Sequence, residues 1–395
     1  MNKQVLIAGG GIGGLAAALA CARAGWRAEV FERAPEFSEF GAGIQMGPNV
    51  MHILHDWGLE AALRAVAAYP ERLVVRDAIT GRVLGTLPLG ERAREKYGAP
   101  YATIARADLL HVLLAAVQPI ERVRLHVQRR VKGFADSGAR VAADVEGQGA
   151  VEGEVLVGAD GLWSAVRAQL LGDGAPRVPG HLAYRAMVPQ CDLPQGLRSQ
   201  VVTVWLGPAM HVVQYPVRGG EWLNVVAIIE GRLEGDLQGW DHGANAAQLQ
   251  AALAHASAPL RELIAAIGAW RLWVLCDRPP VAGAAQMAQG RVALLGDAAH
   301  PTRPYLAQGA GMAIEDAEAL GRQLARGGEP VAQRLQHYAQ ERWPRCARIQ
   351  AQSTRNGVIF HARGPLRWGR DASMRLLGER VLDLPWLYRY AGAGR

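Results

Sequence analysis

The chain opens with short apolar runs separated by a glycine-rich break. QVLIAG predicts a buried strand, GIGGLAAALACARAG predicts a helix of small residues that stops at Gly25, and RAEVFER predicts the next strand. The segment EVLVGADGLWSAVRAQLL gives strand, turn and helix again. These patterns predict a βαβ unit and an interrupted, Rossmann-like nucleotide-binding domain of the α/β class.

The middle of the chain has the alternating pattern of antiparallel strands. VVTVWLG, MHVVQYPV and WLNVVAII are predicted strands, and RGGE predicts a hairpin turn between the last two. A second hairpin is predicted between Leu73 and Leu89, and one short helix near residues 246–256. This part is expected to form a mainly antiparallel β-sheet domain, so that the molecule combines α/β and α+β regions.

Helical periodicity marks two further segments. YATIARADLLHVLLAAV, residues 101–117, and the amphipathic pattern of residues 331–351 each predict a helix. We therefore expect a discontinuous nucleotide-binding domain, a substrate-binding domain inserted into it, and a C-terminal helical region. The expected boundaries are 1–72, 100–178 and 275–330 for the first, 73–99 and 179–274 for the second, and 331–395 for the third.

Composition narrows the class of protein. The 395 residues are enough for two domains, since single cores stop growing at roughly 250–300 residues. The net charge of +7 comes mostly from scattered Arg without a basic run, so we expect no nucleic-acid partner and weakly favour anionic small molecules. The four Cys form no CxxC pair, and no apolar run reaches the ~20 residues of a membrane span. A cytoplasmic enzyme with neither membrane insertion nor a metal site is expected.

Gly9, Gly11 and Gly14 form a G-x-G-x-x-G motif between the first strand and the first helix. Such a motif lets the chain turn at Gly9, a pyrophosphate approach the backbone at Gly11, and the helix pack on the strand at Gly14. Glu32 ends the next strand, where its carboxylate can accept the ribose hydroxyls of an adenosine. The motif predicts a dinucleotide site but does not distinguish NAD from FAD, and a tight turn without a ligand stays open.

Three further segments carry a resemblance to a known family. GADGLWSAVR at 158–167, LLGDAAHP at 294–301 and the isolated Arg106 in IARADLL occur in the order and at the separations of the single-component FAD-dependent aromatic hydroxylases. The segments GAGIQMGPNV, MHVVQYPVRGG, PYLAQGAGMAIEDA and PWLYRY look most like the 3-hydroxybenzoate 6-hydroxylase and salicylate hydroxylase branch. The resemblance covers nearly the whole chain.

The resemblance implies a fold of the p-hydroxybenzoate hydroxylase type and a monooxygenase reaction. FAD would be reduced by NADH or NADPH, O2 would form a C4a-hydroperoxyflavin, and a monocyclic phenolic aromatic carboxylate would be hydroxylated. A homodimer is common in the family. Alternatives are a decarboxylating hydroxylase of a hydroxynicotinate-like acid, a hydroxylase of quinone precursors at a membrane, and a non-catalytic flavin or nucleotide sensor. A flavin-dependent halogenase is disfavoured because the chain has no W-x-W-x-I-P segment.

The GD turn and the helix after it complete the predicted cofactor site. Asp297 follows an apolar strand, so its carboxylate emerges at the edge of the sheet where ligands bind, although it could instead cap the next turn. Gly309, Ala310 and Gly311 open a helix whose positive end suits a reduced flavin. From motif and resemblance together, the expected cofactor contacts are Gly9, Gly11, Gly14, Glu32, Arg33, Gln45, Arg106, Asp160, Gly161, Asp297, Pro301, Gly309, Ala310 and Gly311.

Candidate catalytic residues lie on one predicted strand and on the GD turn. A strand presents alternate residues on one face, so His211 and Tyr215 should point together, and we expect them to polarise the substrate phenol. A sheet-face His and a core-edge Tyr are the structural alternative. His300 could be catalytic, although positioning is favoured. Arg303 departs from the family pattern and either binds a substrate carboxylate or points to solvent, and Gln308 is a further substrate candidate.

Overall fold

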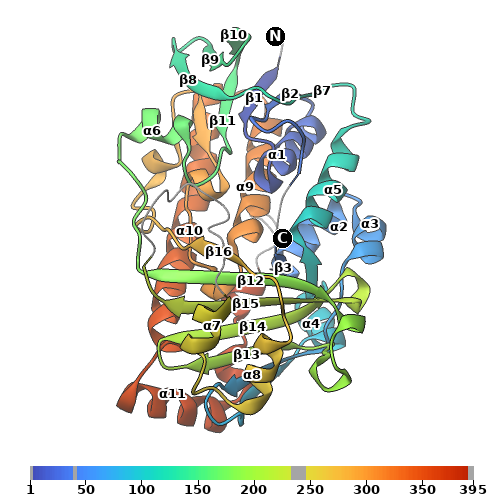
Figure 1. Ribbon diagram of the computed structural model, residues 1–395. Helices are drawn as coiled ribbons and strands as arrows, with labels where there is room; N and C mark the ends of the chain where they lie inside the picture. Colours follow the sequence, from blue (N-terminus) through green and yellow to red (C-terminus); the bar gives the residue numbers. More distant parts are fainter. Residues whose placement is uncertain (1–2, 39–41, 233–245, 390–395) are drawn as a thin grey trace.

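The computed structural model describes residues 3–38, 42–232 and 246–389 (Figure 1). The predicted βαβ unit is confirmed: β1 (Gln4–Ala8), α1 (Ile12–Arg23) and β2 (Arg27–Phe31) follow one another, and β1 and β2 pair in parallel. They belong to a six-stranded sheet of order β17-β18-β11-β1-β2-β7. Its other strands are β7 (Val123–His126), β11 (Val155–Gly158), β17 (Ala288–Gln289) and β18 (Val292–Leu294).

A seven-stranded sheet crosses the lower half of the molecule in Figure 1, with order β16-β12-β15-β14-β13-β4-β5. Every neighbouring pair is antiparallel except β13 with β4, so the predicted antiparallel sheet and both hairpins are confirmed. Its strands are β4 (Arg72–Asp77), β5 (Val83–Pro88), β12 (His181–Pro189), β13 (Val202–Gly207), β14 (Met210–Val217), β15 (Trp222–Glu230) and β16 (Arg271–Val274).

The two faces of this sheet have different covers. One face packs against α7 (Ala246–Ala252) and α8 (Ala258–Ala265) through apolar residues such as Val212 and Val225. The opposite face contacts Phe360 and Tyr305 through Leu206 and Ile228. Because Tyr305 follows the GD turn of the first sheet region, this second face is the one that meets the predicted cofactor region.

The remaining elements connect and cover the two sheets. A short ladder joins β3 (Gly43–Met46) to β6 (Ala102–Ala105), and a small sheet combines β8 (Val131–Asp136), β9 (Val141–Val145) and β10 (Gly149–Gly153). The other helices are α2 (Pro48–Asp56), α3 (Glu60–Val66), α4 (Gly90–Tyr97), α5 (Arg106–Val117), α6 (Ala165–Leu171), α9 (Gly309–Ala325), α10 (Val331–Phe360), α11 (Gly364–Leu377), α12 (Glu379–Leu382) and α13 (Pro385–Tyr388).

Three element predictions need correction. Residues 101–117 are not one helix, because Ala102–Ala105 pairs with β3 and the helix begins only at Arg106. Two helices, α7 and α8, stand where one was expected, since a second helix begins at residue 258 with Pro259 in its first turn. The long helix runs to Phe360 rather than to residue 351 because its last turns pack on Tyr305, which a Cβ at Gly357 would approach to 3.1 Å.

In the part of the chain that the structure describes, no helix is both long and apolar enough to cross a membrane. The expected domain boundaries stay a prediction.

Candidate active site

The glycine-rich turn has the tight geometry that the sequence predicted. Gly9 has φ +99°, and a Cβ there would lie 2.4 Å from the Ala159 carbonyl oxygen. A Cβ at Gly14 would lie 1.9 Å from the Gly9 carbonyl oxygen, while Gly11 is the N-cap of α1. The structural reasons for Gly9 and Gly14 are confirmed, because neither position has room for a side chain. Their contact with a cofactor stays a prediction.

Glu32 braces this turn. Its two carboxylate oxygens accept hydrogen bonds from the Gly10 amide at 2.6 Å and from the Ala34 amide at 2.8 Å. The neighbouring Arg33 is exposed. The Glu32 carboxylate is thus fixed beside the N-terminus of α1, where a ribose hydroxyl could reach its remaining lone pairs.

Asp297 and Arg106 place opposite charges near each other beyond the turn. Asp297 lies in a short 3-10 turn (Gly296–Ala298) directly after β18, and it is exposed. Arg106 begins α5. Burial lowers the pKa of its guanidinium, and the Asp297 carboxylate offsets only part of this shift. An exposed carboxylate at a strand end and a partly buried cation fit a dinucleotide with hydroxyls and a diphosphate.

The start of α9 lies beside Asp297. A Cβ at Gly309 would be 4.0 Å from the Asp297 Oδ1 atom, and the N-cap residue Gln308 makes no side-chain cap. Gly309 and Ala310 are only partly buried. The amide groups of this helix end can therefore face a negatively charged ring. Together with the glycine cradle, these residues fit FAD.

Asp160 binds the first turn of α6, whose N-cap residue is Ser164, and its contact with the cofactor stays a prediction. Its carboxylate accepts hydrogen bonds from the Ser164 hydroxyl at 2.5 Å and the Ala165 amide at 2.8 Å, and Gly161 has φ +78°. The sequence reading overlooked Arg167, whose Nη1 donates to the carbonyl oxygens of Ala298 and Ala299 at 2.9 and 2.5 Å. The DG segment is thereby tied to the GD turn.

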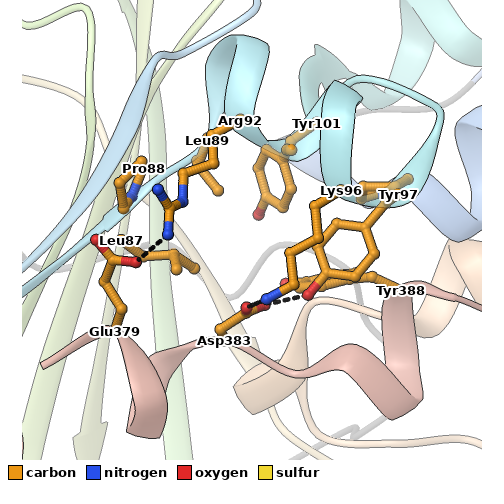
Figure 2. Close-up of a pocket in the computed structure, with 12 residues that line it drawn as sticks. Leu87, Pro88, Leu89, Arg92, Lys96, Tyr97, Tyr101, Glu379, Asp383 and Tyr388 are labelled. Carbon is orange, nitrogen blue, oxygen red and sulfur yellow. Dashed lines mark hydrogen bonds and ion pairs between the residues drawn. The ribbon is translucent and has the colours of Figure 1, made fainter. Parts of the chain in front are cut away.

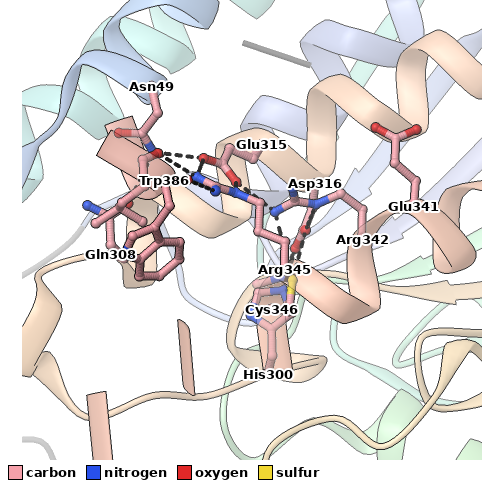
Figure 3. A network of polar contacts seen from close by, with 12 residues as sticks. Asn49, His300, Gln308, Glu315, Asp316, Glu341, Arg342, Arg345, Cys346 and Trp386 are labelled. Carbon is pink, nitrogen blue, oxygen red and sulfur yellow. Dashed lines mark hydrogen bonds and ion pairs between the residues drawn. The ribbon is translucent and has the colours of Figure 1, made fainter. Parts of the chain in front are cut away.

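Behind the GD turn lies a buried ionic network, shown in Figure 3, which consists of His300, Glu315, Asp316, Arg342 and Arg345. His300 Nε2 is 2.5 Å from Asp316 Oδ2, and Asp316 Oδ1 accepts from Arg342 at 2.7 Å. Burial alone would lower the pKa of His300, but the Asp316 carboxylate raises it well above the ordinary value. His300 is therefore a charged member of this network, a placement that favours positioning.

The network reaches the start of α9 through Asn49 of α2. The Asn49 amide donates to Glu315 at 2.7 Å and to Gln308 at 3.2 Å. Pro301, next to His300, accepts a hydrogen bond at its carbonyl oxygen from Gln350 at 3.1 Å. Gln308 and Pro301 are both buried and held by these partners. Their contacts with substrate and cofactor stay predictions.

His211 and Tyr215 extend from the same face of β14, as predicted. His211 Nδ1 lies 2.8 Å from His361 Nε2, and the Tyr215 hydroxyl donates to the Gly43 carbonyl oxygen at 2.7 Å. Both are buried, whereas Val213 between them is partly exposed in the middle of the sheet. Because four strand residues span about 13 Å, the two side chains are too far apart to touch, and we call the sheet surface between them, around the partly exposed Val213, the Val213 face.

Gln45 and Tyr101 lie at the Tyr215 end of the Val213 face. The Tyr101 hydroxyl donates to Gln45 Oε1 at 2.5 Å, and Tyr101 belongs to the same apolar cluster as Tyr215. Burial raises the pKa of both tyrosines above the ordinary value, so they are neutral hydrogen-bonding groups. Nothing in the local sequence distinguished Tyr101, because its partner Gln45 belongs to β3, which is distant in the sequence.

A pocket opens from the surface toward Tyr101 (Figure 2). Three contacts between α4 and the C-terminal segment cross it: Arg92 pairs with Glu379 at 3.3 Å, and Lys96 and Tyr97 both bind Asp383. The rim is thus cationic on the α4 side and anionic on the C-terminal side.

Arg185 is a cation on the Val213 face that the sequence did not point to. Its strand pairing places it opposite Val226, which is in turn opposite Val213. Its guanidinium lies 4.9 Å from the Trp273 ring centre, and its buried Nε makes no hydrogen bond among the described residues. Arg185 thus shares the face of His211 and Tyr215, and its Nε–H donor is available to a ligand.

Arg303 neither points freely to solvent nor has its Nε available. That atom donates to Asp277 Oδ2 at 2.6 Å, and Asp277 also pairs with Arg177 at 2.9 Å. The Arg303 side chain is 15% exposed and the Asp277 side chain 4%. This ion pair anchors the segment after the GD turn to residue 277 of the chain.

Known proteins are similar in sequence to this chain over almost its full length. The profile of the family described as "FAD binding domain" matches residues 2–353. The chain is 41% identical to a 3-hydroxybenzoate 6-hydroxylase of Polaromonas naphthalenivorans (strain CJ2), covering 98% of this chain and 96% of that protein. It is 39% identical to 3-hydroxybenzoate 6-hydroxylase 1 of Aquipseudomonas alcaligenes, covering 92% and 91%. A 6-hydroxynicotinate 3-monooxygenase of Bordetella bronchiseptica (strain ATCC BAA-588 / NCTC 13252 / RB50) is 34% identical, covering 90% and 91%.

Solved structures share the fold. Klebsiella pneumoniae HpxO complexed with FAD and uric acid superposes with a TM-score of 0.85 at 24% identity, covering 98% of this chain and 96% of that one. A salicylate hydroxylase substrate complex gives 0.81 at 24% identity, covering 100% and 98%. The predicted fold of the p-hydroxybenzoate hydroxylase type is confirmed. The chain belongs to the FAD-binding family of single-component aromatic hydroxylases and is an FAD-dependent monooxygenase.

Proposed function

We propose that this monooxygenase hydroxylates a monocyclic phenolic aromatic carboxylate of the 3-hydroxybenzoate or salicylate type, with NADH as the reductant. The observation that supports this most is the Val213 face, on which His211, Tyr215 and Arg185 all lie around the partly exposed Val213. A phenol and a carboxylate on one ring match a hydrogen-bond acceptor and a guanidinium that lie on the same face of the sheet. The relatives named 3-hydroxybenzoate 6-hydroxylase support the same substrate class.

The cofactor site would be formed by the glycine turn, Glu32, Arg106, Asp297 and the start of α9. When bound, FAD supplies the redox chemistry that passes reducing equivalents from the nicotinamide nucleotide to O2 and delivers one oxygen atom to the ring. The chain holds the flavin hydroxyls through Asp297 and offers the N-terminal amides of α9 to negative charge on the ring. A helix N-terminus stabilises such charge by about 0.3–2 kcal/mol.

The phenol is the group that the chain would activate. Burial, followed by the neighbouring His361 and His181, holds the pKa of His211 well below its ordinary value, so His211 is neutral at pH 7. Its Nε2 makes no hydrogen bond with any described residue and can receive the phenol proton. The Tyr215 hydroxyl donates to Gly43 and can still accept a hydrogen bond from the substrate.

For the substrate carboxylate we propose Arg185, because its Nε is buried without a hydrogen bond while the Nε of Arg303 is held by Asp277. A guanidinium binds a carboxylate through two parallel hydrogen bonds, which makes the choice of an acid over an amide selective. Arg303 would then act on the site by fixing the segment that carries Tyr305.

A substrate screen tests the proposal. The purified protein, loaded with FAD, is offered hydroxybenzoates, salicylate and hydroxynicotinates while NADH oxidation, O2 uptake, H2O2 and hydroxylated product are measured. We expect one phenolic acid to accelerate NADH oxidation with product formed in equal amount. If NADH oxidation yields only H2O2 with every acid, the protein is not a hydroxylase of this class, and a flavin or nucleotide sensor becomes the better description.

A decarboxylating hydroxylation of a hydroxynicotinate-like acid is the second candidate, which the relative named 6-hydroxynicotinate 3-monooxygenase supports. The two candidates differ in the fate of the carboxyl carbon. Release of labelled CO2 from carboxyl-labelled substrate, in equal amount to NADH consumed, would select this second reaction.

A further inference from the structure

Three histidines from separate segments meet at the His211 end of the Val213 face. We call His181 of β12, His211 of β14 and His361, the residue after α10, the histidine cluster. The ring centres of His181 and His361 are 5.0 Å apart, and those of His211 and His361 are 5.1 Å apart. The Tyr305 hydroxyl and His181 Nδ1 are hydrogen-bonded at 2.6 Å. The cluster is therefore one packed unit that includes the proposed base, His211.

Polar atoms form a line through this cluster from the interior to the surface. His211 Nδ1 is 2.8 Å from His361 Nε2, and the other nitrogen of His361, Nδ1, is 3.9 Å from Glu230 Oε1. Side-chain exposure rises from 4% at His361 to 43% at Glu230, while His211 is 1% exposed. Arg363 donates to Glu230 Oε2 at 2.7 Å and so leaves Oε1 for His361.

His361 Nδ1 is buried and makes no hydrogen bond in the described structure. A buried nitrogen without a partner is costly, so its position 3.9 Å from a carboxylate indicates the group that it faces. A small rotation of the exposed Glu230 side chain, or one bridging water, completes this contact.

Each ring of the line is neutral at pH 7, so the position of its single proton matters. Burial is the largest cause, and His181, Arg363, Arg303 and Arg370 follow it in holding the pKa of His361 at about 3. A neutral imidazole has one N–H donor and one lone pair. When His361 keeps its proton on Nδ1, toward the Glu230 carboxylate, its Nε2 is an acceptor, and His211 must then donate from Nδ1.

We propose that Glu230, acting through His361, is a positioning residue that holds His211 in the Nδ1–H form, so that the Nε2 lone pair of His211 faces the substrate. This inference rests on the proposed function of the site. The step it serves transfers one proton: the phenol O–H bond breaks and the His211 Nε2–H bond forms. The His211 imidazolium keeps its Nδ1–H on His361, and the Glu230 charge at the end of the line stabilises it. A carboxylate that orients a histidine base in this way sets both tautomer and basicity.

The tautomer can be measured without turnover. In FAD-loaded protein labelled with 15N-histidine, the His211 and His361 resonances are assigned by their loss in His211→Gln and His361→Gln. We expect the His211 signals of a protonated Nδ1 and an unprotonated Nε2 at pH 7, and a gain of the Nε2–H form in Glu230→Gln. An Nε2–H form of His211 in the unchanged protein, or spectra of Glu230→Gln identical to it, overturns the inference even if the hydroxylase activity is found.

Kinetics provide the second test once a substrate is found. His361→Gln retains an acceptor for the His211 Nδ1–H, whereas His361→Phe has none. We expect His361→Phe to lower kcat/KM by about 10–100-fold, the usual cost of losing such a partner, and His361→Gln to recover most of it. Equal activity of the two variants contradicts the inference.

Glu230→Gln keeps the size of an exposed side chain, so it avoids a folding defect. It should lower kcat/KM severalfold and shift the kinetic pKa of His211 downward, because losing the carboxylate destabilises the imidazolium. Its matched control is Glu221→Gln, an exposed carboxylate at the other end of β15. A pH profile of Glu230→Gln that superposes on that of Glu221→Gln counts against the proposed role. If no aromatic acid is turned over, the proposed function fails, and the 15N measurement still decides the tautomer.

Discussion

The ionic network and the histidine cluster are both buried, yet their histidines have opposite charge states. His300 has the Asp316 carboxylate at 2.5 Å and a pKa well above the ordinary value. His211 has another histidine at 2.8 Å and a pKa well below it. The cluster meets the Glu230 carboxylate at its surface end, 3.9 Å from His361. Burial lowers the pKa of both histidines, so the comparison shows that an adjacent carboxylate decides whether a buried histidine is charged.

The largest effect is expected from breaking the ionic network. Arg342→Met removes a fully buried cation that binds both Glu315 and Asp316, leaving two carboxylates with fewer partners. We expect the free energy of unfolding to fall by about 3–5 kcal/mol, measured by chemical denaturation of the FAD-loaded protein. Arg355→Met, which changes an exposed arginine of the same helix, is the matched control and should be nearly neutral. Equal losses in both variants would contradict a special role of the network.

Changes on the cluster side are expected to alter turnover instead of stability. His211→Ala and Tyr215→Phe remove the polar groups at the two ends of the Val213 face, and general acid–base assistance contributes about 10²–10⁴-fold. We expect His211→Ala to lower coupled hydroxylation by about 10²-fold or more, and Tyr215→Phe by less, because the Tyr215 hydroxyl orients the substrate. FAD content and substrate-free NADH oxidation should be unchanged. Unimpaired coupled turnover would remove both residues from the mechanism.

The two arginines that face these regions can be separated by substrate charge. Arg185→Leu should raise KM for an aromatic acid by about 10–100-fold and have a much smaller effect on the corresponding amide, since a hydrogen bond to a charged group contributes about 1.5–3 kcal/mol. Arg303→Leu should weaken acid and amide alike, because its Nε is bound to Asp277. The result that contradicts this assignment is acid-selective weakening in Arg303→Leu without it in Arg185→Leu.

The smallest effect is the pH dependence of stability, for which the two histidines have opposite signs. The raised pKa of His300 means that its contribution is fully present below pH ~6.5 and is lost as pH rises through the folded-state pKa. The pKa of His361, lowered to about 3, means that its contribution is present above pH ~6.5 and is lost as pH falls toward 3.

Unfolding measurements on His300→Gln and His361→Gln across this range test those signs. The free energy of unfolding of His300→Gln should be lower than that of the unchanged protein at acid pH, and this difference should shrink as pH rises. The free energy of unfolding of His361→Gln should rise relative to that of the unchanged protein as pH falls. Each slope is at most about 1.4 kcal/mol per pH unit. Slopes of the same sign would refute the comparison.

Local sequence patterns predicted much of the fold. The first βαβ unit and both hairpins follow from short-range periodicity and turn residues. The strand at Ala102–Ala105 was missed because its partner, Gly43–Met46, lies far away in the sequence. The end of α10 was missed because packing against Tyr305 prolongs the helix.

The site divides in the same way. The sequence by itself determined the residues with a local requirement: Gly9 and Gly14, which have no room for a side chain, and Asp297 at the end of its strand. It also placed His211 and Tyr215 on one face, since a strand alternates by two.

Only the tertiary structure decided which groups face one another. Arg185, Tyr101 and His361 join the site through neighbours on other strands and helices, and no local pattern marks such pairs. The same holds for the charge of the histidines, because a pKa depends on which charges lie within a few ångströms. Sequence therefore specified the residues available for chemistry, and the packing of distant segments determined the partner and the charge state of each.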